Sequence, residues 1–251
     1  VNCKVLQFTP IPEGISDILK LKDVMATKVD LSKRPFTVED SQGETYTSET
    51  VIISTGASAL YLGLENETKL QGRGVSACAT CDGFFFKNKH VYVVGGGDTA
   101  CEEATFLTKY ASKVSMVVRR DQMRASKIMQ ERAFKNDKIE FLWNTVVTEV
   151  HGDDSGVSGV SLYNRVDETT RRLDVTGYFS AIGHRPNTDL FKEQLDMNDV
   201  GYLNVKSPST YTNIEGVFAA GDVADPVYRQ AVTAAGMGCS AAIDAERWLE
   251  A

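Results

Sequence analysis

The chain has 251 residues, 42% hydrophobic and 24% charged, which is typical of a globular protein with one large or two medium domains. Its formal net charge of −7, from 27 basic and 34 acidic residues, argues against a nucleic acid as its partner. No apolar run approaches the roughly 18 residues of a membrane helix, residues 1–15 lack a signal pattern, and the five cysteines are scattered, so we expect a cytoplasmic protein without a membrane anchor.

Short β-branched runs alternate along the chain with helical patterns, which predicts an α/β fold with parallel sheets. Residues 146–174 instead alternate polar and β-branched positions around a turn at 153–156, which predicts an antiparallel hairpin over one face. The predicted strands are 26–31, 36–39, 50–54, 91–94, 114–118, 139–143, 157–163 and 216–220.

The strand predicted at 91–94 runs directly into a glycine turn, GGGDTA, at residues 95–100. This turn fits the pattern G-x-G-x-x-A. Gly95 allows the tight turn, Gly97 lets a phosphate approach the backbone, and the small Ala100 lets the helix pack on the strand. The sequence therefore predicts a dinucleotide-binding site at this turn.

The helix after the turn carries an apolar stripe that should face a sheet, and Thr99 and Glu102 are expected to form a capping box at its start. The same glycine pattern also occurs at 72–77 and at 236–241, but no apolar strand directly precedes the turn in either place. The stripe consists of Ala100, Ala104, Leu107 and Ala111.

Arg119 and Arg120 follow the strand predicted at 114–118, and Arg124 lies a little further on. They stand at the ~20-residue distance from the glycine turn where an acidic residue would bind the ribose of NAD. Guanidinium groups make charge-assisted contacts with phosphate, so arginines here favour the 2′-phosphate of NADPH, although a solvated basic strand end is the alternative.

Cys78 and Cys81 form a C-x-x-C pair upstream of the glycine turn. On the first turn of a helix this spacing brings the Cα atoms within the ~4.4–6.8 Å that a disulfide tolerates, and helix N-terminal amides favour the thiolate. The pair can therefore cycle between dithiol and disulfide, and a flavin is the usual adapter between a nicotinamide and a disulfide.

Half of a zinc knuckle is the competing interpretation of the pair, but no second pair of ligands is visible, so we expect no metal. Asp82 could supply or take a proton beside the dithiol, or only stabilise a helix through its dipole. No chemistry is assigned to the remaining cysteines, which are Cys3, Cys101 and Cys239.

Together these residues resemble the low-molecular-weight thioredoxin reductases. The resemblance runs from about residue 29 to the C-terminus. It is carried by STGA at 54–57, GRGVSACATCDG at 72–83, RR at 119–120, AIGH at 181–184, FAAGDV at 218–223 and RQA at 229–231.

The resemblance implies an oxidoreductase that reduces thioredoxin with NADPH through FAD and the Cys78/Cys81 pair. Cys78 would be the interchange thiol that attacks thioredoxin, Cys81 the thiol that faces the flavin, and Asp82 the acid. The residues implied to hold NADPH are Gly95, Gly97, Asp98, Thr99, Arg119, Arg120 and Arg124. The residues implied to lie by FAD are Thr55, Gly56, Ala57, Gly221, Asp222, Arg229, Gln230 and Ala231.

The resemblance also implies a homodimer with two dinucleotide-binding, Rossmann-like domains in each chain. A partial FAD domain, residues 1–58 and 204–251, would be interrupted by an NADPH domain, residues 59–203, that carries the dithiol. No strand with a G-x-G-x-x-G turn precedes the matched region, although residues 12–15 resemble a segment just beyond it, so the FAD domain is expected to be N-terminally truncated. Two alternatives stay open: a related flavoprotein that serves another disulfide protein, such as a peroxidase system, and a flavin-free NADPH-binding fragment without turnover.

Overall fold

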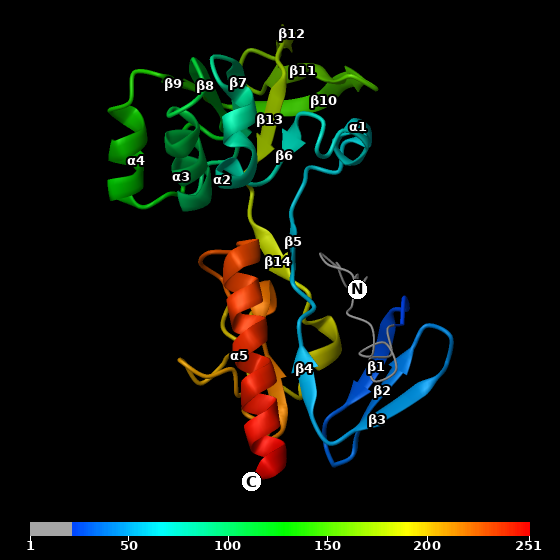
Figure 1. Cartoon of the computed structure of the whole chain (residues 1–251). Coiled ribbons are helices and arrows are strands. Elements are labelled where there is room, and N and C mark those ends of the chain that lie inside the picture. The colour runs from blue at the N-terminus through cyan, green and yellow to red at the C-terminus, as the bar shows by residue number, and fades with distance from the viewer. Residues whose placement is uncertain (1–21) are drawn as a thin grey trace. The chain divides into compact units, whose positions relative to one another are not determined.

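A computed structural model describes residues 22–251 of the chain, and Figure 1 labels its helices and strands. Cys3 and the segment at 12–15 lie outside the described residues. No helix in the described part of the chain combines the length and the apolar character that crossing a membrane requires.

The chain divides into two compact units. Unit 1 joins Val1–Ser58 with Arg185–Ala251, and unit 2 is Ala59–His184. The sequence placed the second boundary later, after residue 203. In the structure the intervening segment packs into the core of unit 1, where its apolar side chains meet Val29 and Leu31. Those side chains are Leu190, Phe191, Leu195, Met197 and Leu203.

Unit 2 is built on a five-stranded sheet in the order β6-β13-β7-β8-β9. Every neighbouring pair is parallel. The central strands are buried on both faces, which explains why they appear in the sequence as nearly continuous apolar runs. The strands are β6 Val75–Ser76, β7 His90–Val94, β8 Lys113–Val117, β9 Ile139–Leu142 and β13 Gly177–Ser180.

Helices cover one face of this sheet: α2 Ala79–Asp82, α3 Asp98–Leu107 and α4 Lys127–Phe134. The apolar stripe predicted for α3 is confirmed, because all four of its alanine and leucine side chains are fully buried. They pack with Val91 and Val93 of the sheet in one core cluster. The alternation of strand and helix makes this an α/β, Rossmann-like unit, as predicted.

The predicted capping box at the start of α3 is wrong. The helix begins one residue before Thr99, with Gly97 as its N-cap, and no side chain caps it. Thr99 therefore lies inside the first turn, where its side chain no longer occupies the capping position. The carboxylate of Asp98 instead contacts another loop, described below.

A three-stranded antiparallel sheet covers the other face: β10 Thr145–Asp153, β11 Gly156–Asn164 and β12 Thr170–Asp174. The predicted hairpin is confirmed as β10 and β11, which pair antiparallel. The underside of this layer packs on Tyr92 and Val94 of the central sheet. The central sheet is thus enclosed on both faces, and the short helix α1 Glu65–Lys69 lies beside β10.

Unit 1 contains an antiparallel sheet of β1 Ala26–Asp30, β2 Phe36–Asp40 and β3 Thr45–Ser48, and a parallel pair of β4 Val51–Ile53 and β15 Val217–Ala219. The long helix α5 packs its buried Ala241 and Ala245 against Phe218 of β15. The other elements of unit 1 are α5 Ala231–Glu250 and the 3-10 helices Asp189–Phe191 and Gly221–Val223. In unit 2 the 3-10 helix Gly83–Phe86 follows α2, and the strands β5 Ala57–Ala59 and β14 His184–Pro186 span the two boundaries between the units.

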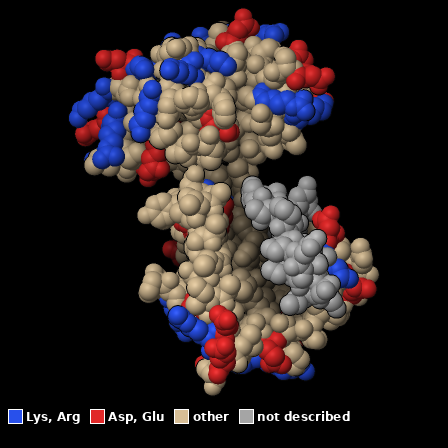
Figure 2. All heavy atoms as spheres, in the orientation of Figure 1, with Lys and Arg blue, Asp and Glu red and all other residues tan. Residues whose placement is uncertain are grey.

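Acidic and basic side chains are interspersed on the face of unit 2 that Figure 2 displays. Unit 2 has exposed ion pairs, among them Lys113 with Glu140 and Lys69 with Glu65. Exposed pairs of this kind contribute little to stability, typically about 0–1 kcal/mol each, so burial of the apolar strands and helices carries the fold.

One carboxylate in unit 2 is fully buried. Glu67 of α1 accepts hydrogen bonds from the backbone N–H of Leu62 at 3.2 Å, the backbone N–H of Leu64 at 2.9 Å and the hydroxyl of Tyr178 at 2.5 Å. A buried charge is tolerated only when such donors satisfy it. These bonds fix the segment that leads into α1.

We expect Tyr178→Phe to lower the free energy of unfolding by about 1–3 kcal/mol, because the buried carboxylate loses a donor that water cannot replace. Urea unfolding followed by circular dichroism measures this change. Tyr163→Phe is the matched control, since the Tyr163 hydroxyl makes no hydrogen bond with the described residues. An equal effect of the two substitutions would contradict the account.

The contact between Tyr178 and Glu67 also makes the stability of the fold depend on pH. Burial and the bond to Glu67 raise the pKa of Tyr178 above its ordinary value. The Tyr178 hydroxyl therefore loses its proton near pH ~10 in the unfolded chain but keeps it in the folded chain. Its contribution to the free energy of unfolding is complete below that pH and declines above it. The stability gap between the parent and Tyr178→Phe should narrow between about pH 9 and pH 11.

Candidate functional site

The glycine turn lies where β7, α3 and the end of β13 meet. Gly95 adopts φ +148°, and a Cβ there would press on the carbonyl oxygen of Ala181 and lie 2.9 Å from the Cβ of Ala100. Only glycine fits this position without moving backbone. A Cβ on Gly97 would meet nothing within 4 Å, so the turn leaves open space on that side for a ligand to approach.

A cavity of about 360 Å³ opens at the carboxyl ends of β7 and β8, where ligands bind in open parallel sheets. Gly95, Gly97 and Thr99 line it together with Arg119, Arg120 and Arg124, so the structure brings together all but one of the residues predicted to hold NADPH. Asp98 is not among the lining residues. The rest of the wall is Leu62, Val94, Gly96, Val117, Val118, Gln122, Thr145, Val146, Val147, Ala181, Ile182 and Gly183.

The guanidinium groups of Arg119, Arg120 and Arg124 form no ion pair within the described part of the chain, and all three arginines are exposed. Three unneutralised cations on one rim attract an anion with several negative charges. Together with the glycine turn, they fit a dinucleotide that carries an additional phosphate on its ribose.

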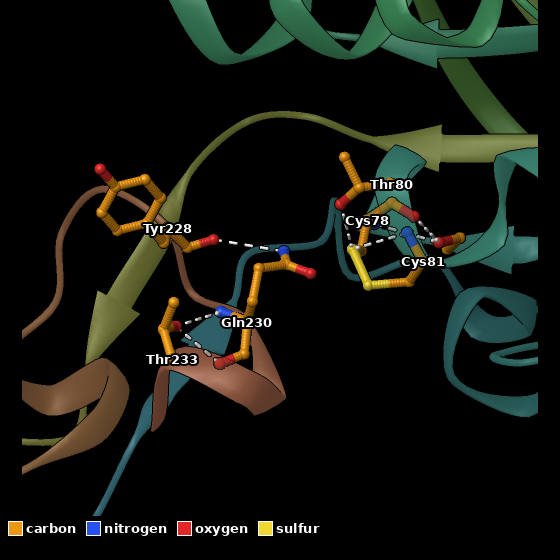
Figure 3. The surroundings of a disulfide bond; sticks show 7 residues. Cys78, Thr80, Cys81, Tyr228, Gln230 and Thr233 are labelled. Atoms are coloured by element: carbon orange, nitrogen blue, oxygen red, sulfur yellow. Dashed lines mark hydrogen bonds between the residues drawn. A yellow bond between two sulfur atoms is a disulfide. The ribbon is translucent and has the colours of Figure 1, made fainter. Parts of the chain in front are cut away.

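The predicted cysteine pair is a disulfide. Cys78 and Cys81 are bonded, with their Cα atoms 5.3 Å apart, and so do not form half of a zinc site. Cys78 is the N-cap of α2, and its sulfur accepts a hydrogen bond from the backbone N–H of Cys81 at 3.2 Å. The hydroxyl of Thr80 lies 3.3 Å from the same sulfur (Figure 3). These donors would stabilise negative charge on Cys78 after reduction.

Helix α2 packs directly on α3, the helix that begins at the glycine turn. A Cβ on Gly83 would lie 3.2 Å from Leu107 and 3.4 Å from Tyr110, so the helices approach closely. Tyr110 also meets Phe84 edge-on, with ring centroids 5.9 Å apart. One helix therefore positions both the disulfide and the nucleotide cavity within unit 2.

Asp82 is the last residue of α2 and is partly exposed. It lines a second cavity of about 400 Å³ in unit 2, together with Arg73, Phe85 and Lys89. A carboxyl group next to the disulfide is in reach of solvent protons, which is a requirement for a proton donor.

The residues predicted to lie by FAD belong to unit 1. Thr55 and Gly56 are held by Asn187: the Thr55 hydroxyl donates to the Asn187 carbonyl at 2.7 Å, and the Asn187 N–H donates to the Gly56 carbonyl at 2.9 Å. Ala57 begins β5 directly afterwards. The backbone of the STGA segment is thus fixed by one asparagine.

Gly221 and Asp222 form the 3-10 helix that follows β15, and φ at Gly221 is +77°. Burial, with a smaller effect of Asp225, raises the pKa of the half-buried Asp222 carboxyl. That carboxyl accepts no hydrogen bond from any residue the structure describes, so a ligand hydroxyl would satisfy it. This fits the ribitol chain of a flavin.

Arg229, Gln230 and Ala231 lie at the start of α5, where Gln230 is the N-cap. Asp225 orders the loop before them by accepting hydrogen bonds from the backbone N–H groups of Val227 at 2.9 Å and Arg229 at 3.1 Å. Burial alone would raise the pKa of Asp225, but the backbone N–H groups of Tyr228, Val227 and Arg229 lower it below its ordinary value.

Sequence reasoning missed Asn187, Asp225 and Ser126. Asp225 is followed by proline, a turn signal that could have identified it as the residue ordering its loop. Asn187 had no such signal, because the residues that it holds lie 132 positions away.

Comparison with known proteins decides the family. A family described as "Pyridine nucleotide-disulphide oxidoreductase" matches residues 10–238, which is most of the chain. The chain belongs to this family. Its curated relatives include a thioredoxin reductase of Streptomyces clavuligerus, 57% identical over 223 residues that cover 89% of this chain and 69% of the relative. Another, from Dictyostelium discoideum, is 53% identical over 227 residues, covering 89% and 71%.

Solved structures agree with this assignment. Thioredoxin reductase from Giardia duodenalis superimposes with a TM-score of 0.82 at 45% identity, covering 91% of this chain and 74% of that one. The Streptococcus pyogenes thioredoxin reductase gives 0.84 at 39% identity, with coverage of 90% and 74%. Membership of this family implies FAD and NADPH as cofactors, and the residues of both units fit them as described above.

Arg119→Ala and Arg120→Ala should each reduce the preference for NADP⁺ over NAD⁺ by about tenfold, because each removes a charge-assisted contact with the 2′-phosphate. Isothermal titration of the purified variants with both nucleotides measures the ratio. Arg132→Ala, on the exposed side of α4, is the control and should leave it unchanged. An unaltered preference in the first two variants would show that the phosphate site lies elsewhere.

The two free cysteines that the structure describes should differ sharply in reactivity. Cys239 is exposed, whereas burial, with the charges of Asp98 and Glu102, raises the pKa of Cys101 to about 11. Iodoacetamide at about pH 8 should therefore modify Cys239 in the folded protein and reach Cys101 only after unfolding. Peptide mass spectrometry reads this directly, and early modification of Cys101 would contradict its burial.

Proposed function

We propose that this chain catalyses the NADPH-dependent reduction of thioredoxin through FAD and the Cys78–Cys81 pair. The observation that carries the proposal is the disulfide on α2, packed on the same helix whose start forms the arginine-lined cavity. The identity of 57% to a thioredoxin reductase supports thioredoxin as the substrate.

NADPH supplies a hydride, and a bound flavin makes its two electrons available to a disulfide. Within this chain, two electrons and two protons convert the Cys78–Cys81 disulfide into two thiols. Cys78, as a thiolate, then attacks one sulfur of the thioredoxin disulfide and forms a mixed disulfide, releasing the other thioredoxin sulfur as a thiolate. Cys81 displaces the remaining thioredoxin sulfur, which restores the starting disulfide and leaves thioredoxin as a dithiol.

The roles of the individual side chains follow from their surroundings. The backbone N–H of Cys81 and the Thr80 hydroxyl both face the sulfur of Cys78, which favours Cys78 as the attacking thiolate and leaves Cys81 for the flavin side. Asp82, partly exposed at the end of the same helix, supplies the proton to the departing thiolate.

For the nucleotides, Gly95, Gly97 and Thr99 would receive the pyrophosphate of NADPH and the three arginines its 2′-phosphate. The unsatisfied carboxyl of Asp222 would hold the ribitol of FAD, with Gly221 beside it. Thr55, Gly56 and Ala57 would lie along the flavin, and Arg229, Gln230 and Ala231 near its ring system.

A protein substrate is supported by the surface next to the disulfide. Phe84 and Phe85, directly after α2, are 64% and 69% exposed, and exposed aromatic side chains of this kind mark protein-docking surfaces. We also propose that the chain acts as a homodimer in the cytoplasm. The exposed Val232, Ile243 and Leu249 of α5 support self-association through unit 1.

Cys78→Ser should lower the rate of NADPH-dependent thioredoxin reduction at least about 100-fold, because the hydroxyl cannot form the mixed disulfide. The FAD-loaded chain, NADPH and oxidised thioredoxin, with thiol release as the readout, provide the assay. Cys239→Ser is the control and should retain the parental rate, since that thiol is free and distant in sequence. Parental activity in Cys78→Ser would contradict the proposed interchange role.

A further inference from the structure

The carboxylate of Asp98, the first residue of α3, is bonded to the start of the next helix. Its Oδ1 accepts a hydrogen bond from the backbone N–H of Ser126 at 2.7 Å and another from the Ser126 hydroxyl at 2.9 Å. Ser126 is the N-cap of α4 and closes the loop at 119–126 that carries the three arginines. Asp98 therefore ties the glycine turn to the far end of this arginine loop.

The backbone provides a second tie beside the first. The carbonyl oxygen of Gly96 accepts hydrogen bonds from the N–H of Arg124 at 2.6 Å and from the N–H of Ala125 at 3.1 Å. Met123, just before them, is buried, with its sulfur 3.6 Å from the sulfur of Cys101 in α3. Arg124 is thus held between the glycine turn on one side and the bond from Asp98 to Ser126 on the other.

Asp98 differs from its two neighbours in its position relative to the cavity. Gly97 and Thr99 line the cavity, but Asp98 between them does not. The resemblance to thioredoxin reductases implied that Asp98 is one of the residues that hold NADPH. We infer instead that Asp98 is a positioning residue, which fixes the arginine loop in the geometry that recognises a 2′-phosphate. This inference rests on the proposed function, because it takes NADPH to be the nucleotide of this cavity.

The direction in which Asp98→Ala changes the affinity for a phosphate distinguishes a positioning role of Asp98 from an effect of its charge alone. Through its charge alone, Asp98 repels a nearby phosphate, so removing that charge would strengthen binding of the anion. If Asp98 is a positioning residue, its removal weakens binding of the anion instead. The loosened loop of the variant must then order its arginines on binding, which costs affinity. The two interpretations therefore predict opposite changes for Asp98→Ala.

An isosteric variant separates the two effects further. Both hydrogen bonds from Ser126 reach the same carboxylate oxygen, Oδ1. The amide oxygen of an asparagine can accept both of them, so Asp98→Asn removes the charge and keeps the tie. Ser126→Ala removes the hydroxyl bond and keeps the backbone bond. Glu102→Ala, which removes an exposed carboxylate from the same helix, is the matched control.

The test is isothermal titration of the purified chain with adenosine 2′,5′-bisphosphate and, as the matched ligand, 5′-ADP. We expect Asp98→Ala to bind the bisphosphate about 3–10-fold more weakly and 5′-ADP within about twofold of the parent, consistent with the loss of one or two exposed hydrogen bonds. Asp98→Asn should bind the bisphosphate as tightly as the parent or more tightly. Ser126→Ala should show a smaller loss, and Glu102→Ala none.

Two outcomes overturn the inference while leaving the proposed function in place: unchanged or tighter bisphosphate binding by Asp98→Ala, or an equal loss for both ligands. A parent chain that does not prefer the bisphosphate over 5′-ADP overturns the NADPH assignment, and this inference with it. Thermal unfolding checks that each variant is folded. If Asp98→Ala does not fold, Ser126→Ala decides, and undiminished bisphosphate binding by that variant overturns the inference.

Discussion

The structure of unit 2 depends on the contact at Gly95, where β7, α3 and the end of β13 approach too closely for any side chain. This contact fixes where α3 begins and in which direction it runs. Its start opens the nucleotide cavity, and its flank receives α2 with the Cys78–Cys81 disulfide. The electron-accepting disulfide and the nucleotide cavity are therefore parts of one rigidly packed arrangement within unit 2, because close-packed protein interiors resist deformation.

The charged groups around these sites fall into two kinds. Glu67, Asp98 and Asp225 each accept hydrogen bonds from backbone N–H groups and from a hydroxyl group, so they hold loops in place. Among the described residues, the arginines of the cavity rim have no carboxylate partner and the carboxyl of Asp222 has no hydrogen-bond donor. These groups are therefore available to a ligand. A satisfied charge thus indicates positioning, whereas an unsatisfied one in a cleft indicates binding.

Much of unit 2 could be predicted from the sequence because its signals are local. The strand at 91–94, the glycine turn after it, the stripe of α3 and the C-x-x-C pair each rest on residues within about one helix length of each other. Predictions that depended on a single residue of register were less secure, as the misplaced capping box at Thr99 shows. Contacts between distant segments, such as those of Asn187 with Thr55 and Ser126 with Asp98, leave no periodic pattern and required the structure.

The proposed function requires that NADPH reduces the Cys78–Cys81 disulfide. It is tested most directly by mixing the FAD-loaded chain with one equivalent of NADPH without oxygen, quenching in acid, and measuring alkylation of Cys78 and Cys81 by mass spectrometry. Both cysteines should become alkylated when NADPH is present and remain protected from alkylation without it, and NADH should be much less effective. A chain that retains flavin and consumes NADPH while its Cys78–Cys81 disulfide stays intact would contradict it.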